Sequence, residues 1–275
     1  MALPTPTRVT VVRVRGVDVS VKVYGDGGMA VVPLSGGGAG CNGYFPDLIE
    51  GLPDCTVVEF DRVGTGKSRT TDPVSMRIWA TDTITVLDAL GIQRALLVGH
   101  SLGGALAAQT LSDYPDRVAG VFLLDPTPLN SPEICAKTAR SANLLIRLCT
   151  APVVGRLLVK LMTSTSKPKH LGKSAEAAFR RTFDGPWLED TAASVALLAE
   201  DARLYAARDI APSGVPVLLA SADRKPLHRY RRAHGEWAEA LGGRLEIWPN
   251  TKHSLYLQEP QRVIDCTREL LKEPS

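Results

Sequence analysis

The stretch that decides the fold is ALLVGHSLGG, residues 95–104. It opens with an apolar run typical of a buried strand, and Leu102 to Tyr114 continue with apolar residues at helical spacing. Glycines stand two residues before and two residues after Ser101, where a sharp turn lifting the serine hydroxyl above a sheet leaves no room for side chains. The pattern therefore predicts a strand, a strained turn carrying Ser101, and a helix. A glycine-rich turn with an incidental serine is the alternative.

A serine hydroxyl becomes a nucleophile when a base removes its proton, and that base needs an acid to orient it. Of the five histidines, His253 alone comes late in the chain and in a turn, after the strand-like residues 244–248. The others are His100 beside the serine, His170, and His228 and His234 in a polar helical stretch. We therefore expect His253 to be the base.

Two aspartates compete for the role of the acid. Asp223 follows an apolar strand that is predicted to end at Ala220, and Asp125 follows the apolar run that ends at Leu124. Either could approach the histidine from a strand end. Chain order in enzymes with this turn is serine, acid, histidine, and Asp223 lies nearer to His253. The sequence thus favours Asp223, with Asp125 as the alternative.

Cleavage of a carbonyl compound also needs backbone N–H groups that face the developing oxyanion. Leu102 supplies one at the start of its helix. The loop LSGGGAG, residues 34–40, follows an earlier strand, and Gly37 is the predicted second donor. A flexible loop, or a nest that cradles a phosphate, would use a glycine run equally well.

Strand-like and helical segments alternate along most of the chain, which predicts an α/β fold with a mostly parallel sheet of about eight strands flanked by helices. An edge hairpin is expected at residues 8–14 and 17–24, and further strands at 29–34, 55–60, 94–98, 118–124, 215–220 and 244–248. The alternation stops between residues 126 and 208, which predicts an inserted helical cap. The predicted core is then 1–125 and 209–275.

The cap sequence has two unusual features. Apolar residues form one stripe from Val153 to Met162, which indicates a helix with one buried face. The segment from Ile134 to Ala175 contains Lys and Arg but no Asp or Glu. A solvated helix face is the simpler interpretation of these charges, and a patch for anionic ligands is the alternative.

Composition narrows the class of protein. The 275 residues carry a formal charge of +3, which gives little reason to expect a nucleic-acid partner. The five cysteines are scattered without the spacing of a zinc site, so we expect free thiols and no metal. No signal peptide and no integral membrane segment are evident, and a cytoplasmic location is expected. The sequence leaves the oligomeric state open.

One segment imitates a nucleotide-binding motif. Residues 64–68, GTGKS, look like the end of a phosphate-binding loop. That motif requires a glycine where this chain has Asp61, and the segment follows the wrong strand. We therefore do not expect a nucleotide site.

Three further segments resemble the α/β-hydrolase superfamily over nearly the whole chain. They are DRVGTGKS (61–68), YPDRV (114–118) and HSLYLQEP (253–260). The resemblance implies Ser101 as nucleophile, Asp223 as acid, His253 as base, and Gly37 and Leu102 as oxyanion donors. Ser35-Gly36 stands where the family commonly has histidine and glycine, which leaves the geometry of that loop open.

The function implied is that of a serine hydrolase without a cofactor. It would cleave an ester, thioester or lactone of a small, partly apolar substrate through an acyl-enzyme on Ser101. Related enzymes with similar motifs cleave carbon–carbon bonds or catalyse eliminations, which is the first alternative. A ligand-binding relative without activity is the second.

Overall fold

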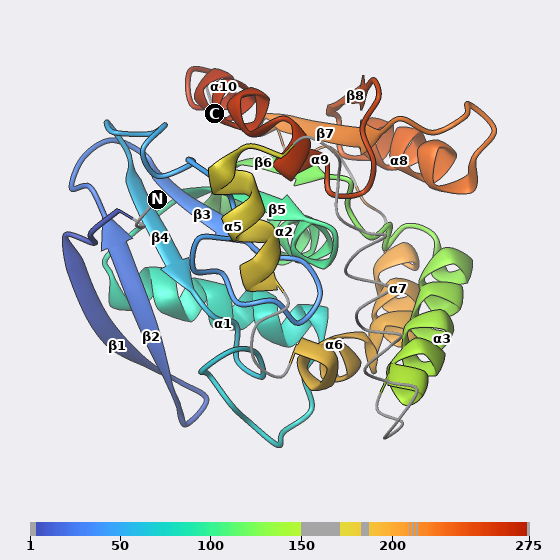
Figure 1. The fold of residues 1–275 in the computed structure, drawn as a ribbon, viewed down its shortest axis with the longest axis horizontal. Helices are drawn as coiled ribbons and strands as arrows, with labels where there is room; N and C mark the ends of the chain where they lie inside the picture. Colours follow the sequence, from blue (N-terminus) through green and yellow to red (C-terminus); the bar gives the residue numbers. More distant parts are fainter. Residues whose placement is uncertain are drawn as a thin grey trace.

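The computed structural model describes residues 4–149, 171–182, 187–208, 210, 212 and 214–273. Figure 1 shows a central twisted sheet with helices on both faces. The apolar stripe from Val153 to Met162 lies outside the described residues, as does part of the acid-free segment.

The sheet has eight strands in the order β1-β2-β4-β3-β5-β6-β7-β8. The strands are β1 (Arg8–Val14), β2 (Val17–Tyr24), β3 (Ala30–Leu34), β4 (Thr56–Phe60), β5 (Ala95–His100), β6 (Val118–Leu124), β7 (Val217–Ala222) and β8 (Arg244–Trp248). β2 pairs antiparallel with β1 and with β4, and the remaining pairs are parallel. The predicted α/β fold with a mostly parallel sheet is confirmed. β7 ends at Ala222, beyond the predicted end at Ala220, so Asp223 follows its strand directly.

Helices cover both faces because the central strands are apolar on both sides. On β6, Val121 and Leu123 face one core cluster, and Phe122 and Leu124 face the other. The first cluster includes residues of α1 (Met76–Ala89), α2 (Leu102–Asp113) and α8 (Arg229–Ala240). The second includes residues of α9 (Leu255–Gln258) and α10 (Pro260–Leu270).

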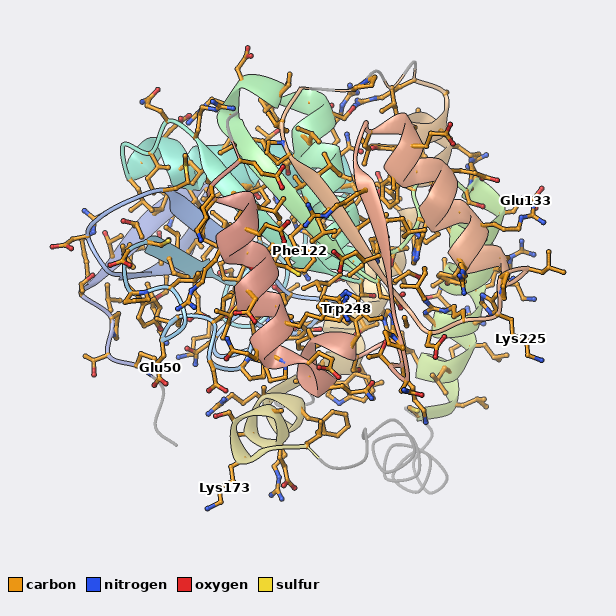
Figure 2. All side chains as sticks on the ribbon, turned by 90° about the horizontal axis from the view of Figure 1, so that it is seen from above. Glu50, Phe122, Glu133, Lys173, Lys225 and Trp248 are labelled. Carbon is orange, nitrogen blue, oxygen red and sulfur yellow. The ribbon has the colours of Figure 1, made fainter. Side chains whose placement is uncertain are left out.

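Trp248 shows how the second layer is closed. Its ring lies 6.2 Å from that of Phe122, and the guanidinium of Arg262 from α10 lies 4.6 Å from its ring centroid. Both aromatic residues lie near the middle of the molecule (Figure 2). The Trp248 side chain at the end of β8 is thus packed between Phe122 of β6 and Arg262 of the C-terminal helix.

The described residues between β6 and β7 form four helices and no strand. These are α3 (Pro132–Cys149), α5 (Lys173–Thr182), α6 (Trp187–Val195) and α7 (Leu198–Ala206). In Figure 1, α3 and α7 lie side by side, and their residues are in contact.

Sheet order decides where chemistry can occur. β5, β6 and β7 are consecutive parallel neighbours, so their carboxyl ends meet at one edge. Ser101 follows β5, Asp125 follows β6 and Asp223 follows β7. In open α/β sheets this edge is where ligands bind.

Candidate active site

The turn at Ser101 is strained in the way its glycines predict. Ser101 has φ 53° and ψ −115°, a conformation that only glycine adopts at low cost. A Cβ added at Gly99 would lie 2.3 Å from the carbonyl oxygen of Gly103, and one added at Gly103 would lie 2.1 Å from that of Leu34. The turn is fastened to the next strand, because Ser101 N–H donates to the Leu124 carbonyl at 3.0 Å.

His253 lies between the serine and a buried carboxylate. Its Nε2 is 3.0 Å from Ser101 Oγ, and its Nδ1 is 2.6 Å from Asp125 Oδ2. Because a carboxylate accepts, Nδ1 carries the proton and Nε2 offers a lone pair to the serine hydroxyl. The imidazole side chain is 54% exposed and Asp125 only 1%, so the imidazole faces solvent and the carboxylate does not.

His253 forms its hydrogen bond with Asp125, the alternative, and not with Asp223, the predicted acid. Asp223 is exposed, and its Oδ2 accepts from the backbone N–H of Asn250 at 2.9 Å. Its own N–H donates to the Thr251 carbonyl at 3.2 Å. Asp223 therefore fastens the loop that carries His253 to the end of β7, and the expectation for it requires correction. Chain order misled here because β6 lies beside β5 in the sheet.

The carboxylate of Asp125 has four donors. Oδ1 accepts from the Ala222 N–H at 3.0 Å and from Arg224 Nη1, while Oδ2 accepts from Arg224 Nη2 at 2.5 Å and from His253. Burial alone would raise the pKa of Asp125, but the hydrogen bonds from Arg224 and His253 outweigh it and lower the pKa. Asp125 is therefore an anion throughout the neutral range. Its backbone φ of 42° is a second strained conformation at a strand end.

His100 supports the histidine loop from beneath. Its Nε2 lies 2.9 Å from the carbonyl oxygen of His253, and its Nδ1 lies 2.8 Å from the Tyr44 hydroxyl. The carbonyl can only accept, so Nε2 donates and Nδ1 accepts from Tyr44. Burial, followed by the charge of His253, lowers the pKa of His100 to about 3. This neutral ring thus supports the backbone of His253.

The glycine loop lies against Ser101. A Cβ added at Gly36 would lie 3.1 Å from Cβ of Ser101, and Gly37 has φ 50°. The buried guanidinium of Arg62 donates to the carbonyl oxygens of Ser35 and Gly37, at 2.5 Å in each case. The carbonyl oxygens of Ser35 and Gly37 therefore point toward Arg62.

Helix α6 packs directly on this loop. Thr191 Oγ1 accepts from the Gly38 N–H at 3.3 Å, and the buried Asp190 accepts from the Gly66 N–H at 2.9 Å and pairs with Arg69. A Cβ added at Gly38 would lie 2.3 Å from the backbone of α6. The segment between β6 and β7 therefore reaches the loop beside Ser101.

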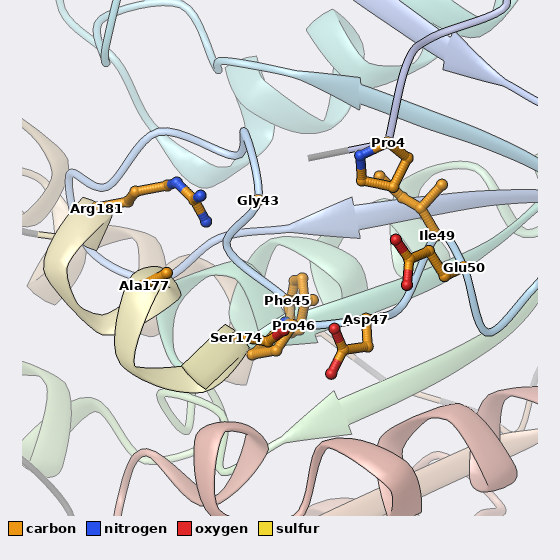
Figure 3. Close-up of a pocket in the computed structure, with 10 residues that line it drawn as sticks. All are labelled: Pro4, Gly43, Phe45, Pro46, Asp47, Ile49, Glu50, Ser174, Ala177 and Arg181. Atoms are coloured by element: carbon orange, nitrogen blue, oxygen red, sulfur yellow. The ribbon is translucent and has the colours of Figure 1, made fainter. Parts of the chain in front are cut away.

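A separate cavity of about 40 Å³ lies between α5 and the segment 43–50 (Figure 3). It is lined by Pro4, Gly43, Phe45, Pro46, Asp47, Ile49, Glu50, Ser174, Ala177 and Arg181. A space of this size holds a few water molecules at most. It contains none of Ser101, His253 and Asp125, and we do not consider it a substrate site.

Two further properties concern the described part of the chain. It contains no group of three or more His, Cys, Asp or Glu residues that could hold a metal ion. It also contains no helix long and apolar enough to span a bilayer.

Sequence reasoning missed Arg224, and it recognised His100 only as a neighbour of the serine. One signal for Arg224 was available, namely its place directly after Asp223 at a strand end. The contact itself depends on strand order, which no local pattern reveals.

Two known proteins with similar sequences are named as hydrolases. The RutD protein of Caulobacter vibrioides, whose name proposes carbamate hydrolysis, is 34% identical over 110 residues, 39% of this chain and 41% of that protein. The 2-hydroxy-6-oxo-6-phenylhexa-2,4-dienoate hydrolase of Comamonas testosteroni is 33% identical over 131 residues, 46% of each chain. The matched region thus spans less than half the length of these relatives.

A solved structure shows the same fold over nearly the full length of both chains. The esterase EaEST from Exiguobacterium antarcticum superposes with a TM-score of 0.75, covering 96% of this chain and 99% of the esterase at 19% identity. The family model described as the alpha/beta hydrolase fold matches residues 30–260. The chain therefore belongs to the α/β-hydrolase family.

Proposed function

We propose that the chain is a serine hydrolase that cleaves an ester-type bond through an acyl-enzyme on Ser101, with His253 as base and Asp125 as acid. The observation that carries the proposal is the hydrogen-bonded series from Ser101 Oγ through His253 to the buried Asp125. Nucleophile, base and orienting acid in that order are what acyl transfer requires.

Each residue has a defined task in the proposed reaction. His253 Nε2 takes the proton of Ser101 as Oγ attacks the carbonyl carbon, and Asp125 stabilises the imidazolium that forms. The N–H groups of Leu102 and Gly37 are the proposed oxyanion donors. The Leu102 N–H is available because first-turn N–H groups of a helix lack intrahelical partners. His253 then protonates the leaving group, and water releases the acyl group by the same route.

We further propose that the segment 126–208 acts as a cap on a core of residues 1–125 and 209–275. The contacts of α6 with Gly38 and Gly66 support this arrangement, because they bring the segment to the loop beside Ser101. The bound substrate would then lie between the cap and the strand ends.

Labelling with a fluorophosphonate probe tests the nucleophile without knowledge of the substrate. We expect the protein to be labelled and Ser101→Ala to be unlabelled, with an unchanged melting temperature. Ester hydrolysis should fall by several orders of magnitude in the same variant, because triad members act as a unit. Equal labelling of both proteins would remove Ser101 from the mechanism, and no labelling of either would favour a ligand-binding relative without activity.

The bond that is cleaved needs a substrate panel. We expect p-nitrophenyl esters to be hydrolysed, with kcat/KM rising about fourfold per added methylene until the pocket is full. A flat series would argue against a partly apolar substrate. The name of the Caulobacter vibrioides relative gives a second candidate, cleavage of a carbamate. Cleavage of a carbon–carbon bond is the other alternative. Cleavage of a carbamate or of a carbon–carbon bond, without hydrolysis of any ester, would favour these candidates over ester cleavage.

A further inference from the structure

Arg224 is bound to the same carboxylate as the histidine base. Its two terminal nitrogens donate to the two oxygens of Asp125, and His253 Nδ1 reaches one of those oxygens at 2.6 Å. The side chains of Arg224 and Asp125 are 17% and 1% exposed. Solvent screening is therefore weak, and this pair differs from an exposed surface ion pair.

The arginine is itself held in place. Its guanidinium lies 5.3 Å from the ring centroid of Tyr230, and Arg231 Nη1 donates to its backbone carbonyl at 2.7 Å. The Tyr230 hydroxyl lies 2.7 Å from Thr138 Oγ1 of α3. A guanidinium anchored in this way presents a rigid two-pronged donor, which a lysine cannot reproduce.

The other ionisable groups around this carboxylate are uncharged or exposed. His234 Nδ1 lies 3.9 Å from Asp125 Oδ1, and burial lowers the pKa of His234 to about 4. His100, whose ring centroid lies 4.7 Å from that of His253, is neutral for the same reason. Asp223 and Lys252 are exposed to solvent. Among the described residues, the charges that His253 meets at neutral pH are thus those of Asp125 and Arg224.

We propose that Arg224 is a positioning residue, an inference that rests on the proposed function. Arg224 fixes the Asp125 carboxylate and sets the pH range in which His253 can act as base. Two cations compete for one carboxylate when the imidazole is protonated. The guanidinium keeps its charge at all working pH values, so the competition always disfavours the imidazolium.

The pH dependence of fluorophosphonate labelling tests this directly. Arg224→Gln removes the charge and keeps one donor, so we expect the midpoint of the labelling rate to move upward by about one pH unit. Arg224→Lys keeps the charge and loses the two-pronged geometry, so the rate should fall while the midpoint stays. Arg229→Gln is the matched control, because the Arg229 guanidinium also lies near the Tyr230 ring, at 5.7 Å from its centroid, but does not donate to Asp125. Its midpoint should be that of the unmodified protein.

The outcomes separate the two claims. If the unmodified protein is not labelled, the proposed function fails. If it is labelled and Arg224→Gln lowers the rate with an unmoved midpoint, Arg224 is only structural and this inference is overturned. Should Arg224→Gln fail to fold, Arg224→Lys decides alone: an upward shift of its midpoint contradicts the role of the charge, and an unmoved midpoint with a reduced rate supports it.

Discussion

The ends of β6 and β7 carry an aspartate each, and the two have opposite surroundings. Asp125 is buried and shared by Arg224, His253 and the Ala222 N–H, whereas Asp223 is exposed and holds the backbone of Asn250. Both serve the same histidine, one through its ring and the other through its loop. A carboxylate that must stabilise an imidazolium gains from exclusion of water, while one that fastens a turn does not need it.

The largest expected effect is on kcat and comes from neutralising Asp125. Neutralising Asp223 gives the comparison. Asp125→Asn should lower kcat for the best ester by about 10⁴, because an amide permits the wrong histidine tautomer. Asp223→Asn should cost less than about tenfold, since an amide oxygen still accepts from Asn250. Steady-state kinetics of both variants at one pH gives the ranking, and the reverse order would return the acid to Asp223.

A smaller effect on kcat is expected from substitution of His100, which contacts the backbone of His253. His100→Phe keeps an aromatic ring but removes the donor to the His253 carbonyl, and should lower kcat roughly ten- to a hundredfold by displacing the base. KM should change little. His100→Gln, which keeps a donor near the Nε2 position, is expected to recover most of the rate. Equal kcat in the two variants would mean that the hydrogen bond does not position the base.

His234 connects the two strand ends and gives a prediction about stability. Its Nε2 donates to the Pro126 carbonyl at 2.8 Å, and its Nδ1 accepts from the Ser221 hydroxyl at 2.8 Å. With its pKa lowered to about 4, the native state binds fewer protons than the unfolded state between about pH 4 and 6.5. This histidine therefore destabilises the protein as pH falls through that window, by about 1.4 kcal/mol per pH unit.

Urea denaturation at several pH values measures how the free energy of unfolding changes with pH. The free energy of unfolding of His234→Gln should decline less steeply on acidification than that of the unmodified protein. Parallel slopes in the two proteins would contradict a neutral buried His234.

Local patterns in the sequence predict most of the fold and two members of the proposed triad. The apolar runs mark the strands, and the glycines around Ser101 mark the turn, because both depend on neighbours in the chain. The choice between Asp125 and Asp223 depends instead on β6 lying between β5 and β7. Arg224 was missed for the same reason, since its partner is contributed by a different strand. Long-range pairing of strand ends leaves no periodicity to detect.

The most direct test of Asp125 as the partner of His253 is proton NMR of the hydrogen between them. A proton shared by an imidazole and a carboxylate at 2.6 Å should resonate far downfield of the amide region, and should be visible when exchange is slowed by cooling. We predict that this resonance persists in Asp223→Asn and disappears in Asp125→Asn, with both variants folded. A resonance that is lost in Asp223→Asn and kept in Asp125→Asn would contradict the account.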